Sequence, residues 1–206
     1  MKKTYKLSWL AAASIATYAI IAVASDIFAN KMLNIGGLAL AGGILLVPFS
    51  FTIRDMMHKL IGFENAKRVV WVTAIINLGI AALLMLLDAM PSAVPGADEL
   101  WHSVMGSSWR IIIASFLAQV VADLMDTYSF EFFTRKLKGK KTWLRVVGSN
   151  LISTPIDSIL FTVIAFLGVL PADVMINSII SSTVLKFAIS LLAIPLAYTH
   201  EKGMKE

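Results

Sequence analysis

Several reactive groups are missing from this chain, and their absence narrows what it can do. It has no cysteine, which excludes disulfides, thiolate metal sites and cysteine nucleophiles. Its three histidines, His58, His102 and His200, lie in three separate connections without metal-ligand spacing such as HExxH. It also has no Walker motif, so the chain does not hydrolyse ATP by itself. We therefore expect neither a metal site nor a cofactor.

Apolar residues dominate what remains. They make up 58% of the 206 residues, with a mean hydropathy of +0.79, whereas soluble domains contain roughly 45 to 50%. A membrane-spanning helix needs about 20 such residues, and the apolar runs predict six spans: 8–24, 38–53, 69–87, 110–130, 147–170 and 174–198. The second is the shortest. The sequence thus predicts an all-α membrane protein, a bundle of six transmembrane helices forming one integral membrane domain over residues 1–206.

The basic residues predict the orientation of this bundle. Fifteen of the 18 lie in segments that the six spans place on one side of the membrane: Lys2, Lys3, Lys6, Arg54, Lys59, Lys67, Arg68, Arg135, Lys136, Lys138, Lys140, Lys141, Arg145, Lys202 and Lys205. The positive-inside rule puts this side, and both termini, on the cytoplasmic side of a bacterial inner membrane. The net charge of +5 is then explained by topology and lipid, and we expect no nucleic acid partner.

Two segments leave alternatives open. The N-terminal lysines and the apolar run before Ser25 imitate a secretory signal, but the run exceeds the roughly 7 to 15 residues of a signal core, which favours an uncleaved first helix. In the long outer connection, residues 97–105 are predicted to form a short helix that begins near Asp98 and ends near Gly106. This helix either rests on lipid, which we favour, or covers a substrate cavity.

Ionisable residues inside the spans are the main functional signal. A charge near the bilayer centre costs roughly 2.5 to 3.5 kcal/mol, so it persists only when it is paired or faces a cavity. Asp157 in the fifth span and Lys186 in the sixth lie at comparable depth and are predicted partners. In the fourth span, Gln119, Asp123 and Asp126 follow the i, i+4, i+7 spacing of one helical face. Asp126 is close enough to the cytoplasmic end that solvation there is an alternative.

Smaller polar residues extend these faces. Asn150, Ser153 and Thr154 precede Asp157, while Ser178 and Ser182 precede Lys186. Three helices then present polar faces, and the simplest arrangement points all three at one cavity for a small solute. The alternative is that the side chains only hold the helices together through hydrogen bonds. For the ionisable residues we favour the functional interpretation.

Helix-disturbing residues accompany the charges. Pro155 removes a backbone donor two residues before Asp157 and predicts a break in the fifth helix there. Gly42, Gly43 and Pro48 interrupt the second span in a similar way, and transporters often build their sites from such interrupted helices.

An enzymatic alternative is an intramembrane hydrolase with two carboxylates that share a proton, for which Asp123 and Asp157 are candidates. Lys186 argues against it, because a nearby cation would keep Asp157 ionised. We therefore predict that the chain is not an enzyme.

Ordered motifs along the chain then indicate a family. They comprise the stretch from Pro48 to Asp55, Gly62 with Ala66, Lys67 and Arg68, Ala114 to Phe116 with Asp126, and Ser149, Asp157, Phe161, Ile164 to Phe166 and Lys186. In this order the chain resembles the vitamin uptake transporter (VUT) family over most of its length after the first helix. The resemblance implies six helices and import of a queuosine precursor, 7-cyano- or 7-aminomethyl-7-deazaguanine. The chain departs from the family at Asp123 and Thr154, where members often have an amide.

Such a 7-deazapurine ligand agrees with the polar residues. A carboxylate accepts the adjacent N–H donors of a guanine-like edge in a fork, and Asp157 is the candidate. Lys186 would orient this carboxylate or donate to the ring carbonyl. The remaining contacts to the polar edge would come from Gln119, Asn150 and Asp123. Asp126, on the same helical face as Gln119, is a further candidate for substrate binding.

Three further expectations concern stacking, gating and partners. Phe116 or Phe161 would stack on the ring. Arg54 and Asp55 are a candidate cytoplasmic gate, with solvated loop charges as the alternative. A vitamin-binding subunit that needs an ATP-driven partner is the rival within transport, because small residues line one face of the first span. These are Ala12, Ala16 and Ala19. Partners beyond lipid, including a homo-oligomer, stay open.

Overall fold

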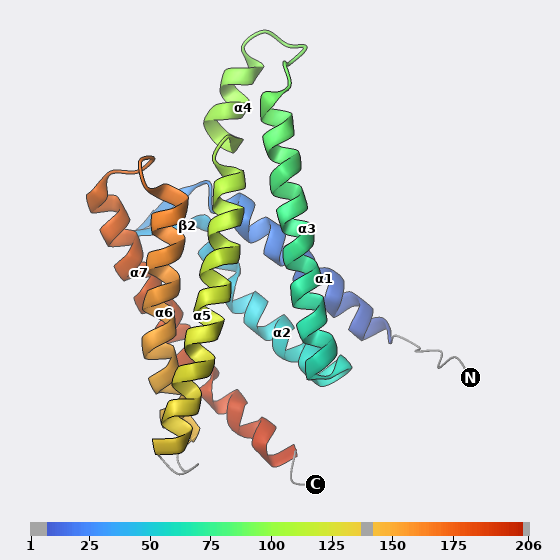
Figure 1. Cartoon of the computed structure of the whole chain (residues 1–206), viewed down its shortest axis with the longest axis vertical. Helices are drawn as coiled ribbons and strands as arrows, with labels where there is room; N and C mark the ends of the chain where they lie inside the picture. Colours follow the sequence, from blue (N-terminus) through green and yellow to red (C-terminus); the bar gives the residue numbers. More distant parts are fainter. Residues whose placement is uncertain (1–7, 137–141, 204–206) are drawn as a thin grey trace. The chain divides into compact units, whose positions relative to one another are not determined.

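A computed structural model describes residues 8–136 and 142–203 of the chain, with the side chains of the last helix described as far as Leu192. The described part is helical apart from one small hairpin (Figure 1). In chain order the elements are α1 (Trp9–Phe28), β1 (Met32–Ile35), β2 (Leu38–Ala41), the 3₁₀ helix η1 (Gly42–Leu46), α2 (Val47–Ile61), α3 (Phe63–Ala89), α4 (Ala97–Met105), α5 (Ser108–Lys136), α6 (Thr142–Phe166) and α7 (Ala172–Gly203). The prediction of an all-α membrane protein is confirmed.

Within the described residues, five segments are long and apolar enough to cross a membrane, and they correspond to five of the six expected spans. They are Trp9–Phe28, Glu64–Ala89, Ala97–Asp126, Val147–Phe166 and Ala172–Leu192. The expected second span differs. Residues 38–41 form a strand and residues 42–46 a 3₁₀ helix, so that α2 begins only at Val47 and contains 15 residues.

The hairpin explains this difference. Gly36 and Gly37 lie between the two strands with φ angles of 61° and 87°, and two successive positive φ angles match the tight turn that suits a two-stranded hairpin. Glycine adopts such angles without steric cost. The Gly-Gly pair between two short apolar runs is a hairpin signal that the span prediction overlooked.

The chain forms two compact units. The first contains residues 1–32 and 41–112, and the second contains residues 33–40 and 113–206. The boundaries fall within the hairpin and near the start of α5. The first unit therefore holds α1, η1, α2, α3 and α4, and the second holds most of the hairpin, most of α5, and α6 and α7.

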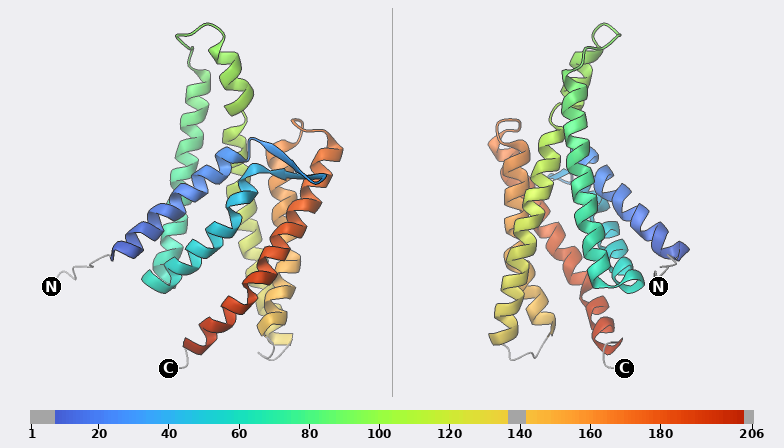
Figure 2. Two further views of the ribbon diagram at one scale, coloured as in Figure 1. Left: turned by 180° about the vertical axis from the view of Figure 1, so that it is seen from behind. Right: turned by 45° about the vertical axis from the view of Figure 1, so that its right-hand side comes forward.

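Helices α1, α2 and α3 pack together in the first unit around an apolar cluster. Tyr18, Met57 and Ala66 are its buried members, one from each helix. The views in Figure 2 show α1 and α2 running alongside each other. At the far end of α1, glycines bring η1 against the helix: a Cβ atom on Gly43 would lie 2.3 Å from the carbonyl oxygen of Ser25. Only glycine permits this approach.

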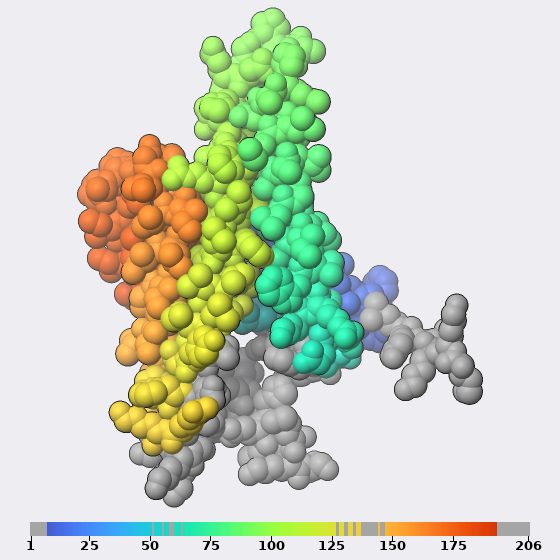
Figure 3. Space-filling view, in the orientation of Figure 1, coloured from blue at the N-terminus to red at the C-terminus, as the bar shows by residue number. Residues whose placement is uncertain are grey.

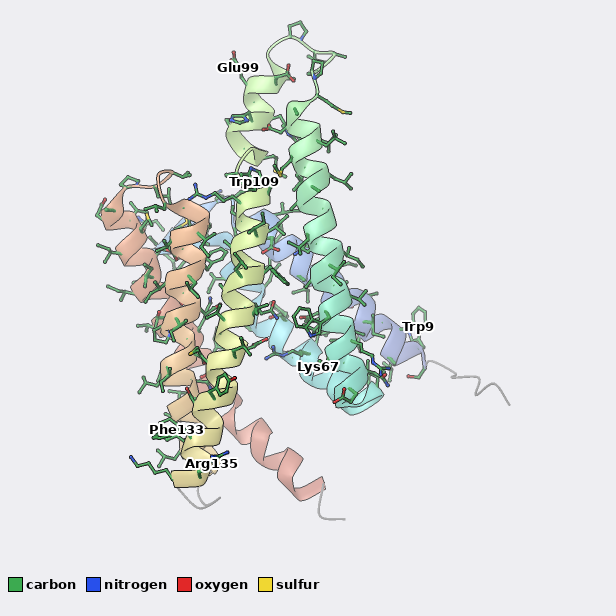
Figure 4. The ribbon with its side chains drawn as sticks, viewed as in Figure 1. Trp9, Lys67, Glu99, Trp109, Phe133 and Arg135 are labelled. Atoms are coloured by element: carbon green, nitrogen blue, oxygen red, sulfur yellow. The ribbon has the colours of Figure 1, made fainter. Side chains whose placement is uncertain are left out.

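Helix α3 continues into a hairpin with α4 that brings opposite charges to opposite ends. Lys67 lies near the start of α3, and Glu99 lies in α4 beyond the other end (Figure 4). His102 contacts Asp88 at 2.8 Å and ties α4 back to α3. Helix α3, which can be followed along its length in Figure 3, has several exposed apolar side chains, including Trp71, Ile75 and Leu86, as expected of a helix in contact with lipid.

The predicted short helix over residues 97–105 is confirmed as α4. It begins after Gly96, with Asp98 in its first turn, and ends at Gly106. No residue of α4 is buried, and its apolar residues Leu100 and Val104 are exposed. This exposure favours the lipid-resting interpretation over a cover for a cavity.

In the second unit, α6 packs along α7, and both helices bury small side chains. Ser158, Thr162 and Ala165 on α6 are buried, as are Ser178 and Ser182 on α7. Small residues at i, i+4 spacing let two helices approach closely, which is the usual basis of helix association in membranes. Helix α6 runs without interruption through Pro155, so the expected break beside Asp157 is not present.

Candidate functional site

An ion pair joins α6 to α7. The ammonium group of Lys186 donates to Oδ2 of Asp157 at 2.6 Å. The side chains of Lys186 and Asp157 are 20% and 25% exposed, so the ion pair is mostly covered by protein but part of it stays accessible. Their predicted pairing is confirmed, and the physical reason is that each charge neutralises the other at similar depth in neighbouring helices.

Two further hydrogen bonds lie along the same face of α6. Asn150 donates through Nδ2 to Oγ of Ser190 on α7 at 3.2 Å. The hydroxyl of Ser153 donates to Oδ1 of Asp126 on α5 at 3.3 Å. Positions 150, 153 and 157 share one helical face, because they are three and seven residues apart. The structure thus brings Asp126, Asn150, Asp157 and Lys186 into one polar region, which we call the 157/186 site.

An aromatic ring lies one turn beyond this ion pair. Phe161 follows Asp157 by four residues in α6, and its ring packs edge-to-face on Phe166 with 5.8 Å between centroids. Phe166 is buried, whereas Phe161 is only half-buried. The contact fixes the ring while leaving part of its surface accessible, as a stacking partner for a planar ligand requires.

The remaining predicted residues are placed less closely. Gln119, Asp123 and Asp126 share one face of the continuous helix α5, with Gln119 half-buried and Asp123 exposed. Phe116 lies on α5 and is half-buried. Arg54 is half-buried on α2, whereas the side chain of Asp55 lies outside the described residues. The ligand roles of these residues and the gate stay predictions.

Sequence reasoning missed a second polar pair, in the first unit. Nδ2 of Asn77 on α3 donates to Oδ2 of Asp26 on α1 at 2.5 Å. Both residues are buried. The expected first span ended at residue 24, whereas α1 continues to Phe28 and therefore includes Asp26. An asparagine within the apolar run of the third span was the available signal.

Sequence reasoning also missed Asn177, which holds the hairpin in the second unit. Its side-chain oxygen accepts a hydrogen bond from the backbone N–H of Ala39 at 2.8 Å, and its Nδ2 donates to the carbonyl of Gly37 at 3.0 Å. A hydrogen bond of 2.9 Å from Ser181 orients the same amide. One side chain on α7 thus holds the turn and the second strand together.

Within the described residues, no group of three or more histidine, aspartate or glutamate side chains is arranged to hold a metal ion. The polar side chains of the 157/186 site offer one carboxylate–ammonium pair, the second carboxylate of Asp126 and the amide of Asn150, with the hydroxyls of Ser153 and Ser190 bonded to them. Such a set can accept and donate hydrogen bonds to a polar, uncharged solute.

Comparison with known proteins identifies relatives over most of the chain. A family model described as "Putative vitamin uptake transporter" matches residues 41–200. A "Probable queuosine precursor transporter" of Bacillus subtilis is 29% identical over 188 residues, which cover 87% of this chain and 80% of the relative.

Two other bacterial proteins are similar over shorter stretches. A "Probable queuosine precursor transporter" of Haemophilus influenzae is 30% identical over 60% of this chain and 51% of its own length. The "Queuosine precursor transporter" of Escherichia coli is 26% identical over 71% of this chain and 64% of its own length. No solved structure matches the chain significantly.

Proposed function

We propose that this chain, which belongs to the vitamin uptake transporter family, imports a queuosine precursor, 7-cyano- or 7-aminomethyl-7-deazaguanine, across the bacterial inner membrane. Transport would proceed by alternating access around the 157/186 site. The observation that carries the proposal is the Asp157–Lys186 ion pair, a partly accessible pair of charges between two membrane helices. The names of the three relatives support the substrate class.

The chemistry of the site suits a guanine-like edge. Such an edge presents two adjacent N–H donors and a ring carbonyl. Asp157 would accept the two donors, because a carboxylate has about four acceptor positions and Lys186 uses one oxygen. Lys186 has three donors and would offer one to the ring carbonyl. Asn150 and Asp126 would complete the polar wall, with Phe161 stacking on the ring.

Ligand binding tests this proposal directly. Purified protein is heated with a panel of purines, deazapurines and vitamins, since a ligand that binds only the folded state raises the melting temperature. We expect the two 7-deazaguanines to raise it and Asp157→Asn to remove the effect. Asp173→Asn, which changes an exposed carboxylate in the first turn of α7, is the matched control. Equal stabilisation of Asp157→Asn and the parent protein would contradict the proposal.

Asp123 provides a test of which precursor is preferred. The exposed carboxylate on α5 would attract a cationic aminomethyl group more than a neutral cyano group. Asp123→Asn is therefore expected to weaken binding of the aminomethyl compound selectively. An unchanged affinity ratio between the two compounds would remove Asp123 from the site.

The rival within transport is a binding subunit that needs an ATP-driven partner. One observation supports this hypothesis. An open apolar depression of about 340 Å³ lies along α1, the helix whose small residues would contact such a partner. Its lining residues are Ala19, Ile20, Val23, Ala24 and Ile27. Uptake by the chain reconstituted alone into liposomes separates the two hypotheses. Binding without flux would favour the subunit, and flux without any partner would exclude it.

A further inference from the structure

The β1–β2 hairpin is divided between the two units. Residues 33–40 belong to the second unit, whereas the residues on either side of them belong to the first. The left view of Figure 2 shows the hairpin reaching the upper part of α7 in the second unit. We call residues 34–39 the tip of the hairpin, and residues 29–32 and 41–43 its stem. Each part makes contacts inside its own unit, and these contacts differ in kind.

The stem is held by buried groups. The backbone N–H of Gly42 donates to the carbonyl of Lys31 at 2.8 Å, and Gly42 and Gly43 are buried. The hydroxyl of Ser108, which is 1% exposed, donates to Oδ1 of Asn30 at 3.0 Å. Because the donors are buried, breaking these bonds would leave polar atoms without a partner inside the protein, which is costly. The stem is therefore firmly attached.

Two hydrogen bonds from one amide join the tip to α7. Oδ1 of Asn177 accepts from the N–H of Ala39 at 2.8 Å, and Nδ2 donates to the carbonyl of Gly37 at 3.0 Å. Residues 34–38 are exposed, Ala39 and Asn177 are half-buried, and burial in β2 begins only at Leu40. Water can therefore replace both hydrogen bonds when the tip leaves α7.

Both sides of this contact keep hydrogen bonds of their own after the tip has left. Ser181, one turn further along α7, donates to Oδ1 of Asn177 at 2.9 Å, so the amide oxygen retains a partner within its own helix. The turn of the hairpin is closed by its own bond, from the N–H of Gly37 to Oδ1 of Asn34 at 3.0 Å. The tip can thus leave α7 and return without refolding its turn.

We propose that the tip is a releasable attachment of α7, which separates from Asn177 in each transport cycle while the stem stays attached. The inference rests on the proposed function, because alternating access requires helices around the solute to move, and α7 carries Lys186. Segments that move are those whose contacts open at low cost, as the exposed tip does. Asn177 is then a positioning residue, which acts on the movement of α7 rather than on the solute.

Hydrogen exchange of the purified full chain tests the release without any solute. The N–H of Ala39 in the tip and the N–H of Gly42 in the stem each make a hydrogen bond of 2.8 Å, so bond length does not bias the comparison. We expect the Ala39 amide to exchange at least about tenfold faster after correction for intrinsic rates, because local opening exposes only the tip. Equal protection of the two amides overturns the proposal.

A covalent link tests whether transport needs the release. The chain has no cysteine, so Ala39→Cys/Asn177→Cys places the only two thiols at the contact. An oxidant joins them as a disulfide, and a short bismaleimide joins thiols that do not meet directly. We expect the linked protein to lose uptake into liposomes by at least about tenfold, and the disulfide form to regain it on reduction. The parent chain, given the same reagents, is the control.

Ligand binding tells a failure of this proposal from a failure of the proposed function. A 7-deazaguanine should raise the melting temperature of the linked protein as much as that of its reduced form, because the link leaves the 157/186 site intact. Full uptake by the linked protein, loss of binding on linking, or failure of the thiols to join overturns the proposal. If the Ala39 amide exchanges fast but the parent binds no 7-deazaguanine, only the substrate assignment is wrong.

Discussion

The two units each pair a carboxylate on one helix with a polar side chain on another, but the pairs differ in charge and exposure. Asp157 and Lys186 neutralise each other, and their side chains are 25% and 20% exposed. Asp26 accepts a hydrogen bond from the amide of Asn77, and both residues are less than a tenth exposed. A partly accessible ion pair suits a solute that must enter and leave, whereas the buried pair between α1 and α3 is closed to a solute.

The way the helices are held together differs as well. In the first unit, apolar side chains such as Met57 fill the space between α1, α2 and α3. In the second unit, α6 and α7 pack against each other and bury several serine and threonine side chains. Small side chains allow close approach of the backbones, and their hydroxyls add polarity beside the ion pair. The second unit is thus the more polar one at its centre.

Breaking the ion pair should have the largest effect on the second unit. Lys186→Met leaves Asp157 without its neutralising partner, which costs about 3 to 5 kcal/mol in a fully buried pair and less in this partly exposed one. The double variant Lys186→Met/Asp157→Leu removes both charges and should recover most of this stability. Denaturant unfolding in detergent measures the difference. We expect the double variant to fold without binding 7-deazaguanine, and a double variant as unstable as Lys186→Met would contradict the pairing argument.

A matching change in the first unit tests the close contact between η1 and α1. A Cβ on Gly43 would lie 2.3 Å from a backbone oxygen of Ser25, so Gly43→Val should destabilise the protein by about 1 to 3 kcal/mol. Gly79→Ala is the control, because nothing lies within 4 Å of its Cβ position. Alanine in a helix interior is favourable, so this control should be neutral or stabilising by up to about 1 kcal/mol. Similar losses for both would refute the contact.

The hairpin of the second unit should respond to Asn177. Asn177→Ala removes two hydrogen bonds to its backbone, for which we expect a loss of about 1 to 2 kcal/mol. Asn177→Asp keeps the acceptor for the N–H of Ala39 and loses only the donor to Gly37. Hydrogen exchange at the Ala39 amide should therefore speed up strongly in the alanine variant and only slightly in the aspartate variant. Equal protection in all three proteins would show that the hairpin does not depend on this side chain.

The smallest expected effect concerns the hydrogen bond next to the ion pair. Ser190→Ala removes the acceptor of Asn150 and should cost about 0.5 to 1.5 kcal/mol. Ser103→Ala in α4 is the control, since its hydroxyl only bonds the carbonyl of Leu100 three residues earlier. Melting temperatures of the two variants make the comparison. A larger fall in melting temperature for Ser103→Ala than for Ser190→Ala would contradict this ranking, because it would mean that exposed α4 contributes more to stability than the Asn150–Ser190 hydrogen bond.

Much of the second unit could be predicted from the sequence. A lysine and an aspartate in adjacent apolar spans have few ways to avoid a high cost, so their pairing follows from depth alone. In the first unit, the helix at residues 97–105 likewise follows from local signals, namely its acidic first turn and the glycine at its end. Both inferences depend on properties of short segments.

The misses have physical causes too. Helix α6 continues through Pro155, because neighbouring groups in a helix bundle can compensate for one missing donor. The hairpin was overlooked because an apolar run next to glycines fits either a span or two strands. Asp26 was placed outside the first span because an apolar count stops at the first charge, whereas α1 continues to Phe28.

The sequence by itself determined that this protein spans a membrane by helices, which family it resembles and which charges must find partners. These follow from composition, since hydrocarbon admits few polar groups and each one is visible in the chain. Only the tertiary structure decided that Asp26 bonds to Asn77, 51 residues away, and that Asn177 holds the hairpin. Those contacts depend on which faces of which helices meet, and that is set by packing along entire helices rather than by any local pattern.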